Sequence, residues 1–517
     1  MRMKLLKKKK SSYFFIVIPL ILLMAILFYR FFMGTEVKNL VIQDSNFSIP
    51  WYQDEDGEFY FFLPEGMNRE ELSFSFNTLF SKCHVSIYED NKQKNISSVD
   101  SISLKDDDYY FISSLKFART RKYLVHFMQS SLPSVFLNID GGDDSYQKIL
   151  SDNMSHQVHY PGDILLMDLN HSVYSAHVKK IRGRGNSTWF REKKPYQISF
   201  QESVSLLGMK ESKKWIFLSN HWDGSLSRNY LWFSLAKKLG IDYSVDCSPC
   251  DLYINHQYVG SYLLTNKIEV SSDSISIDEG YFFEIMNQRI HDLDLDHGYQ
   301  INIKYPNIKN MSSSQSLKVK RESLDYLNKI ESLIYDDSVT IEELEQYIDI
   351  DSFIKFYWVQ ELSENYDASR GSNYFYVRDN QLFMGPIWDM DNTLNRSYRY
   401  TDVSIQYLLK DRALSVRSKE NWFQELSKRE EFVLLVDEFY KNHYDDFNEL
   451  LSLLDDYYNY IELSASMNYI RWPYQKMRKE QLRDWITEDV DFHSSCQLLS
   501  DNLSKRIKFY QEYYQMS

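Results

Sequence analysis

The sequence predicts an α+β protein with an apolar N-terminal helix, a β-sandwich-like domain and a mixed part that ends in helices. Three observations lead to this prediction. An uncharged stretch follows a basic N-terminus, short strands separated by turn residues fill the next hundred residues, and helical patterns dominate from about Leu317 onward. With 517 residues and 43% hydrophobic content, the chain can form two or three domains with large cores.

The N-terminus predicts a membrane anchor. Residues 1–10 carry six basic side chains and no acidic one, and the 17 residues from Tyr13 to Tyr29 carry no charge. With the apolar residues up to Met33, this stretch is just long enough to span a bilayer. It ends without the small residues that mark a cleavage site. We therefore expect an uncleaved single-pass signal anchor at 13–33, with the basic tail 1–12 in the cytoplasm and the bulk of the chain outside the cell membrane.

Charge and cysteine content limit the classes of partner. The net charge is −14, and it becomes −20 once the first ten residues are left out. Such an acidic chain argues against nucleic acid as a main partner and favours basic substrates or divalent cations. Only four cysteines occur, of which Cys247 and Cys250 form a C-S-P-C pair. This pair suits either a local disulfide or two free thiols, because a zinc site needs further ligands nearby.

Segments 35–140 and 141–517 differ in pattern. Residues 35–140 read as short strands such as EFYFFLP and SVFLNID, and the boundary lies near Leu132-Pro133 or at the turn 140–142. Residues 141–310 mix strands and helices, including a hairpin with its turn at Asn255-His256, and residues 311–517 are largely helical. The segment IDSFIKFYWVQEL is apolar on more than one face and predicts a buried helix.

Acidic and amide side chains flank a predicted hairpin. Asn365, Asp367 and Asn373 lie in and just after a loop that leaves the buried helix, and Asp389 and Asp391 follow a strand. The hairpin between them brings the two segments together, and such oxygen ligands suit Mg²⁺ or Mn²⁺. Aspartate and asparagine are also common in turns and caps, so the residues alone leave a metal site and a structural role equally open.

The stretch IRGRGNSTWFREKKPYQISF, residues 181–200, has the composition of an anion-binding loop. Gly183 and Gly185 permit close backbone approach, and the Ser187 and Thr188 hydroxyls add hydrogen-bonding groups. The lysine pair 193–194 follows on a predicted strand, an arrangement used over phosphates by protein kinases. The stretch lacks the G-K-[ST] of a Walker A loop, and no helix follows it as a Rossmann fingerprint requires. A surface turn stays open as the plainer interpretation.

Several of these motifs together resemble the CotH kinase family, named for spore coat protein H. The segments that carry the resemblance are RGRGNSTWFREKKPY, KKWIFLSNHWDGSLSRN, LYINHQYVGSYLL, ELSENYDASRGSNYFY and GPIWDMD. They occur in the family's order, and the resemblance covers roughly residues 133–515. It implies an atypical protein-kinase-like two-lobe fold, with a small lobe at about 141–310 and a helical lobe at about 311–517. It also implies transfer of phosphate from ATP, with Mg²⁺ or Mn²⁺, to serine hydroxyls of secreted or surface proteins.

The resemblance also assigns roles to single residues. Lys194 is expected to contact phosphate and Asp367 to accept the proton of the substrate hydroxyl. Asn373, Asp389 and Asp391 are expected to hold the metal. The nucleotide-covering loop corresponds to Arg182, Gly183, Arg184, Gly185, Asn186, Ser187, Thr188 and Trp189, with Lys194 completing the nucleotide-binding set.

Two points keep other functions open. The family often has a glutamate where this chain has Asn266, so that either Glu269 substitutes for it beside the phosphate-binding lysine or the activity is low. The roles of Arg228 and Asn229, which lie in another family motif, do not follow from the resemblance. A non-catalytic surface protein with a kinase-like scaffold is therefore one alternative. A D-x-D metal-dependent glycosyltransferase is another, although no nucleotide-sugar βαβ unit is recognisable.

Overall fold

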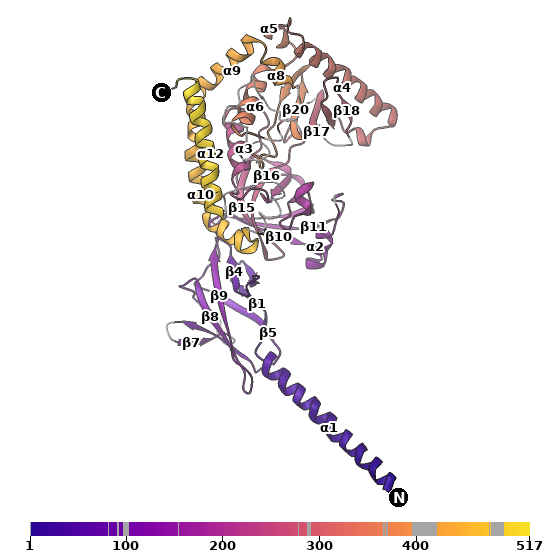
Figure 1. The fold of residues 1–517 in the computed structure, drawn as a ribbon, viewed down its shortest axis with the longest axis vertical. Helices are drawn as coiled ribbons and strands as arrows, with labels where there is room; N and C mark the ends of the chain where they lie inside the picture. Colours follow the sequence, from indigo (N-terminus) through magenta and orange to yellow (C-terminus); the bar gives the residue numbers. More distant parts are fainter. Residues whose placement is uncertain are drawn as a thin grey trace.

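A computed structural model describes most of the chain, and its parts are arranged one after another along the long axis of the molecule (Figure 1). Helix α1, Arg2–Met33, leads into a β-rich domain, a closed barrel and a second sheet covered by helices. The structure describes residues 2–80, 82–89, 92–96, 103–153, 155–277, 279–286, 291–365, 368, 371–394, 421–474, 476 and 491–516.

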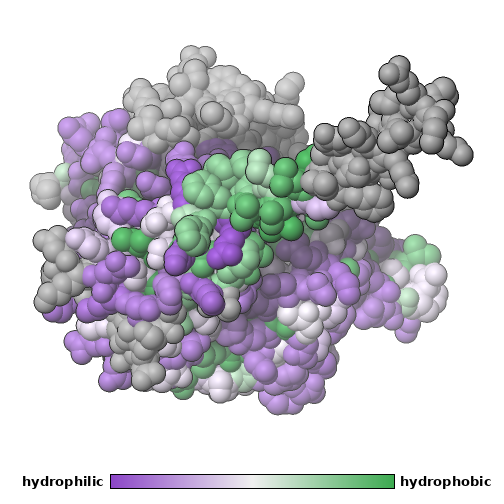
Figure 2. All heavy atoms as spheres, turned by 90° about the horizontal axis from the view of Figure 1, so that it is seen from below, coloured by the Kyte–Doolittle hydropathy of each residue, from purple (hydrophilic) through white to green (hydrophobic). Residues whose placement is uncertain are grey.

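Helix α1 projects away from the folded domains. From Ile18 to Phe32 its large apolar side chains are mostly exposed. Figure 2, which shows the molecule from below, contains an apolar patch on this side. Within the described residues, no helix combines the length and the apolar character needed to cross a bilayer. The signal anchor at 13–33 therefore stays a prediction.

Two sheets form the domain that follows α1. The smaller sheet has the order β2 (Ser48–Pro50), β1 (Val37–Gln43), β5 (Ser73–Thr78). The larger has the order β3 (Tyr52–Gln53), β4 (Phe59–Leu63), β9 (Arg121–Gln129), β8 (Asp108–Ser114), β6 (His84–Glu89), β7 (Lys92–Asn95). They share one apolar core, as a sandwich does, but β4 and β9 pair in parallel, which the antiparallel prediction did not include.

A seven-stranded barrel closes next. Its order is β10 (Ser134–Ile139), β11 (His159–Met167), β12 (Val173–Gly183), β13 (Tyr196–Val204), β14 (Ser212–Leu218), β16 (Gln257–Asn266), β15 (Cys247–Ile254). Helix α2, Gly142–Leu150, connects β10 to β11. Strand β10 was expected to end the first domain, yet it pairs in parallel with β15 and belongs to the barrel. The predicted hairpin is present as β15–β16, with positive φ at Asn255 and His256, as a two-residue turn of this kind requires.

The second sheet unites distant parts of the chain. Its order is β18 (Leu293–Asp294), β19 (Gln300–Tyr305), β17 (Gly280–Met286), β20 (Gly371–Arg378), β21 (Gln381–Met384). Because β17 pairs with β20, the predicted division at about residue 311 runs through this sheet. The helices that pack around it are α3 (Arg228–Lys238), α4 (Ser313–Ile334), α5 (Ile341–Leu344), α6 (Ile350–Leu362), α8 (Trp422–Leu426), α9 (Glu430–Asn442), α10 (Tyr444–Arg471) and α12 (Phe492–Tyr513). Helix α6 is buried on most of its surface, as predicted.

Helices α10 and α12 run along one side of the molecule and join its parts (Figure 1). A buried carboxylate at the junction, Asp251 of β15, accepts hydrogen bonds from Ser130 before the barrel, from Ser464 of α10 at 2.6 Å, and from Tyr258 at 3.0 Å. Burial raises the pKa of Asp251, and these hydrogen bonds oppose the rise. The β-rich domain, the barrel and the long helix thus share one polar centre.

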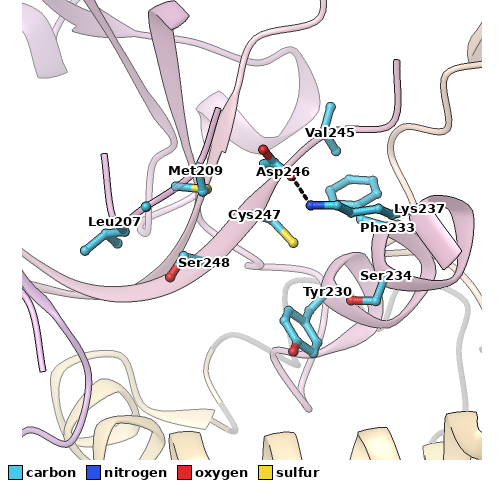
Figure 3. A pocket seen from close by; sticks show the side chains of 11 residues that line it. Leu207, Met209, Tyr230, Phe233, Ser234, Lys237, Val245, Asp246, Cys247 and Ser248 are labelled. Carbon is cyan, nitrogen blue, oxygen red and sulfur yellow. Dashed lines mark hydrogen bonds and ion pairs between the residues drawn. The ribbon is translucent and has the colours of Figure 1, made fainter. Parts of the chain in front are cut away.

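The C-S-P-C pair consists of two free thiols. Residues three apart on a strand point to opposite faces, so Cys250 enters the barrel core while Cys247 faces α3. There Cys247 lines a pocket of about 290 Å³ together with side chains of α3 such as Tyr230 and Phe233 (Figure 3). None of the residues predicted for the nucleotide or metal site lines this pocket.

Candidate functional site

The glycine loop begins where β12 ends and is packed against itself. Trp189, in the short 3₁₀ turn Ser187–Phe190, is buried, and its indole N–H donates to the Asp152 carbonyl at 2.9 Å. A Cβ at Gly183 would overlap the six-membered ring of this tryptophan. Gly185 has φ +91°, a left-handed backbone that favours glycine. Both glycines are therefore needed for the loop's own shape.

The two lysines after the loop were expected on a strand, but they precede β13, which begins at Tyr196. Both are held on the barrel side. Lys193 is fully buried and its Nζ donates to the Ser261 carbonyl at 2.5 Å. Burial lowers the pKa of Lys193 to about 7, and the charge of Asp251 opposes this effect. Lys194, expected to contact phosphate, donates to the Trp189 carbonyl at 2.6 Å and to the Arg191 carbonyl at 3.1 Å. Its ammonium thus braces the loop.

Two arginines of the loop differ in their partners. Arg182 donates to the His156 carbonyl at 3.1 Å and to Gln197 Oε1 at 3.3 Å. The backbone N–H of the half-buried Arg184 donates to the Pro195 carbonyl at 3.2 Å. Its guanidinium lies 5.5 Å from the ring centre of Trp388, and it has no hydrogen bond or ion pair with the residues that the structure describes. Burial lowers its pKa, and the neighbouring Tyr374 and Asp389 oppose this. Arg184 thus places a cation beside an acidic residue.

The hairpin β20–β21 lies between the loop with Asn365 and the segment around Met390, and these two segments are in contact. Asn365 donates to Gln360 Oε1 at 2.7 Å and contacts the sulfur of Met390 at 3.4 Å. Gln360 in turn donates to Asn373 Oδ1 at 3.4 Å. Asp389 is exposed and has φ +63°, a backbone that non-glycine residues adopt only when their surroundings hold them there. The proposed base, Asp367, lies outside the described residues.

One family model, described as CotH kinase protein, matches residues 181–510, which is more than half of the chain. The chain belongs to the CotH kinase protein family. The match begins at Ile181, two residues before the end of β12, and includes the glycine loop, the hairpin and the acidic segment after it. Comparison with curated proteins finds none that matches.

The carboxylate expected to replace the usual glutamate of the CotH family has other partners. Glu269 pairs with Lys214 at 2.7 Å and with Lys267 at 3.1 Å. Asn266 accepts the backbone N–H of Asp246 at 2.9 Å, which is a structural role on β16. Glu269 therefore forms an ion-pair cluster with two other lysines, near the first residues of β14 and just after the last residue of β16.

The donor set near the hairpin fits a divalent cation through Asp389 and Asp391. Magnesium commonly takes one or two protein carboxylates and completes its shell with water and phosphate oxygens. Asn373 fits less well, because its side chain is buried and already hydrogen-bonded. Its Nδ2 donates to the Gly371 carbonyl at 2.9 Å, and its Oδ1 accepts a hydrogen bond from Gln360 Nε2. Among the described residues, no group of three or more histidine, cysteine, aspartate or glutamate side chains is arranged to hold a metal.

Sequence reasoning missed a second polar group beside Arg184. Glu284 of β17 is buried, receives the Tyr374 hydroxyl at 3.2 Å and pairs with Lys304 at 2.9 Å. Burial raises the pKa of Tyr374 well above its ordinary value, and the charge of Glu284 adds to this. These residues lie on strands far apart in sequence, so no spacing pattern linked them to the loop.

Residues 220–229 also contribute to the site. The buried His221 has a pKa lowered to about 3, first by burial and then by the charge of Lys193, so it is neutral at pH 7. Arg228 and Asn229, whose roles the sequence did not reveal, contact the segment after β21. Asn229 Nδ2 also donates to Asn220 Oδ1 at 3.2 Å.

Proposed function

We propose that the chain is a membrane-anchored extracytoplasmic protein kinase. It transfers the γ-phosphoryl group of ATP, with Mg²⁺ or Mn²⁺, to serine hydroxyls of secreted or surface proteins. The observation that carries the proposal is the meeting of the glycine loop with the acidic segment, where Arg184 lies over Trp388 beside Asp389. Phosphoryl transfer depends mainly on positioning and charge stabilisation, and a guanidinium beside an exposed carboxylate can contribute to both.

In the proposed reaction, the serine oxygen bonds to the γ-phosphorus while the bond from that phosphorus to the bridging oxygen breaks and ADP leaves. The hydroxyl proton passes to Asp367. Arg184 faces the phosphate chain and balances its charge. Asp389 and Asp391 would hold a divalent cation, which would supply charge neutralisation at the phosphate oxygens.

The proposed location outside the cell depends on α1. Its basic start and the uncharged stretch from Tyr13 to Tyr29 support anchoring with the N-terminus in the cytoplasm. The exposed apolar side chains from Ile18 to Phe32 support burial of this helix in a bilayer. Flotation of the full chain with lipid vesicles, and loss of flotation when residues 1–33 are removed, tests this location.

Incorporation of labelled phosphate tests the activity. The purified chain is incubated with γ-labelled ATP and Mn²⁺, and label is measured in the chain itself and in exported proteins. We expect Asp367→Ala and the double variant Asp389→Ala/Asp391→Ala to lose labelling. Arg378→Ala, which removes a surface pair with Asp242, a hydrogen bond to the Tyr243 hydroxyl and a cation–π contact with Phe383, serves as the folded control and should label normally. If the aspartate variants label as well as the wild type, the mechanism is wrong.

One observation favours a second candidate, a non-catalytic surface scaffold. Both lysines after the loop donate to backbone carbonyls, Lys193 to Ser261 and Lys194 to Trp189. A kinase should gain thermal stability from ATP with Mn²⁺, because ligands that bind only the folded state raise its stability. A complete lack of stabilisation by any nucleotide would favour the scaffold.

A further inference from the structure

The first turn of α3 holds the backbone of the acidic segment. Asn229 Oδ1 accepts the N–H of Met390 at 2.9 Å, and Arg228 Nε donates to the Thr393 carbonyl at 2.7 Å. Both side chains are at least 96% buried, so their hydrogen bonds are protected from water. Met390 is the residue between the two aspartates.

The side chain of Thr393 completes this attachment. Its hydroxyl receives the indole N–H of Trp232, one turn further along α3, at 2.8 Å, and donates to the Met390 carbonyl at 2.7 Å. Both backbone polar groups of Met390 are thereby fixed to α3, one directly by Asn229 and one through Thr393. We call Arg228, Asn229, Trp232 and Thr393 the α3 clamp.

The clamp has a rigid base. Asp223, which is fully buried, accepts the backbone N–H of Arg228 at 2.7 Å and forms an ion pair with its guanidinium. A second hydrogen bond runs from the same guanidinium to Ser225 Oγ at 3.2 Å. A buried pair of this kind is costly to break, because removal of one partner leaves the other charge uncompensated.

The conformation of Asp389 explains why such an attachment is needed. Its left-handed backbone is unfavourable for a residue with a side chain, so the surrounding structure must hold it there. The side chain is nevertheless exposed, whereas the adjoining Met390 is completely buried. The clamp therefore contacts the backbone of this segment and leaves the Asp389 carboxylate exposed, where it can bind a cation.

We propose that Arg228 and Asn229 are positioning residues that keep Asp389 and Asp391 in the arrangement that binds a divalent cation. This inference rests on the proposed function, because it takes the metal site from there. It extends that function to a part of the chain that touches neither nucleotide nor protein substrate. A structural role alone would lower stability and leave metal affinity unchanged.

Titration of the purified full chain with Mn²⁺ alone, followed by electron paramagnetic resonance, tests the inference without any activity measurement. Asn229→Ala should weaken Mn²⁺ binding about 10- to 100-fold, as loss of a group that supports a metal ligand commonly does. Asn229→Asp keeps an oxygen for the Met390 N–H and should bind Mn²⁺ within a few-fold of the wild type.

Asn468→Ala is the matched control. Asn468 is equally buried and accepts the backbone N–H of Ser261 at 3.2 Å, but it lies on α10 at the barrel. It should cost similar stability and leave Mn²⁺ affinity unchanged. Amide hydrogen exchange at Met390 should become faster in Asn229→Ala only.

The outcomes separate the two claims. Wild-type Mn²⁺ affinity in Asn229→Ala, or an equal loss in Asn468→Ala, overturns the positioning role while the proposed function stands. If the wild-type chain binds no Mn²⁺, the proposed function fails and the positioning role falls with it. In that case, faster amide exchange at Met390 in Asn229→Ala would show that the α3 clamp only stabilises the local backbone.

Discussion

Replacement of Gly183 by alanine should destabilise the barrel, because the place of the new methyl group is already occupied. The added Cβ would lie 2.7 Å from Cζ2 of Trp189 and closer still to two other ring atoms. Real Cβ contacts do not reach such distances, so either the indole or strand β12 must move. Overpacking of this kind costs about 1–3 kcal/mol.

The indole has little freedom to move aside. Trp189 is 2% exposed, and its N–H donates to the Asp152 carbonyl at 2.9 Å. A shift that relieves the clash would stretch this hydrogen bond, which contributes roughly 0.5–1.5 kcal/mol. We therefore expect Gly183→Ala to lower the free energy of unfolding by about 2–4 kcal/mol, near the sum of the two effects.

Urea unfolding followed by tryptophan fluorescence measures this loss, and Gly371→Ala is the control. Among the described residues, no atom lies within 4 Å of a Cβ placed at Gly371, and the backbone there is outside the left-handed region, so the change should stay within about 0.5 kcal/mol. If Gly183→Ala is as stable as Gly371→Ala, the interpretation of Gly183 as the seat of the tryptophan is wrong.

Three further predictions concern charged groups. Lys193→Met should remove the rise in unfolding free energy between about pH 7 and 10. Burial lowers the pKa of Lys193 to about 7, so the unfolded chain binds more protons in that range; an unchanged slope in urea unfolding would contradict this. Arg506→Ala should lower the free energy of unfolding by about 3–5 kcal/mol, because it leaves the buried Glu361 without the guanidinium at 2.8 Å. In the same denaturation assay, Lys508→Ala, which removes only an exposed ion pair with Glu512, should lower it by less than about 1 kcal/mol. Arg184→Met should weaken binding of ATP with Mn²⁺ by about ten- to a hundredfold in calorimetry, the value of one charged hydrogen bond, and unchanged affinity would rule out a phosphate contact.

The sequence predicted those parts of the site that depend on local pattern. The hairpin turn at Asn255-His256 follows from residues that tolerate positive φ. The convergence of Asn365 and Asn373 with the segment around Met390 follows from a short hairpin that returns the chain to its starting edge. In both cases the partners are close in sequence or are joined by one hairpin.

The remaining parts depend on contacts between distant segments. Strand β17 pairs with β20 across about ninety residues, and neither strand carries a mark of its partner. The direction of each lysine could not be predicted either. Both lysines precede β13, so no strand alternation fixes their directions. Lys193 reaches the Ser261 carbonyl and Lys194 reaches the Trp189 carbonyl, and only the packing decides which is which.

Different sets of contacts hold the two sides of the candidate site, and the two sides meet where Arg184 lies over Trp388. On the barrel side, Trp189 fills the space above Gly183 and fixes the loop that carries Arg184. On the other side, the α3 clamp fixes Met390, and therefore also the neighbouring Trp388 and Asp389. The guanidinium of Arg184 lies 5.5 Å from the ring centre of Trp388, so a change in either set of contacts alters the position of the cation relative to the carboxylate. We infer that the loop and the acidic segment respond to mutation as one unit, and that variants on the two sides are not additive in their effect on Mn²⁺–ATP binding.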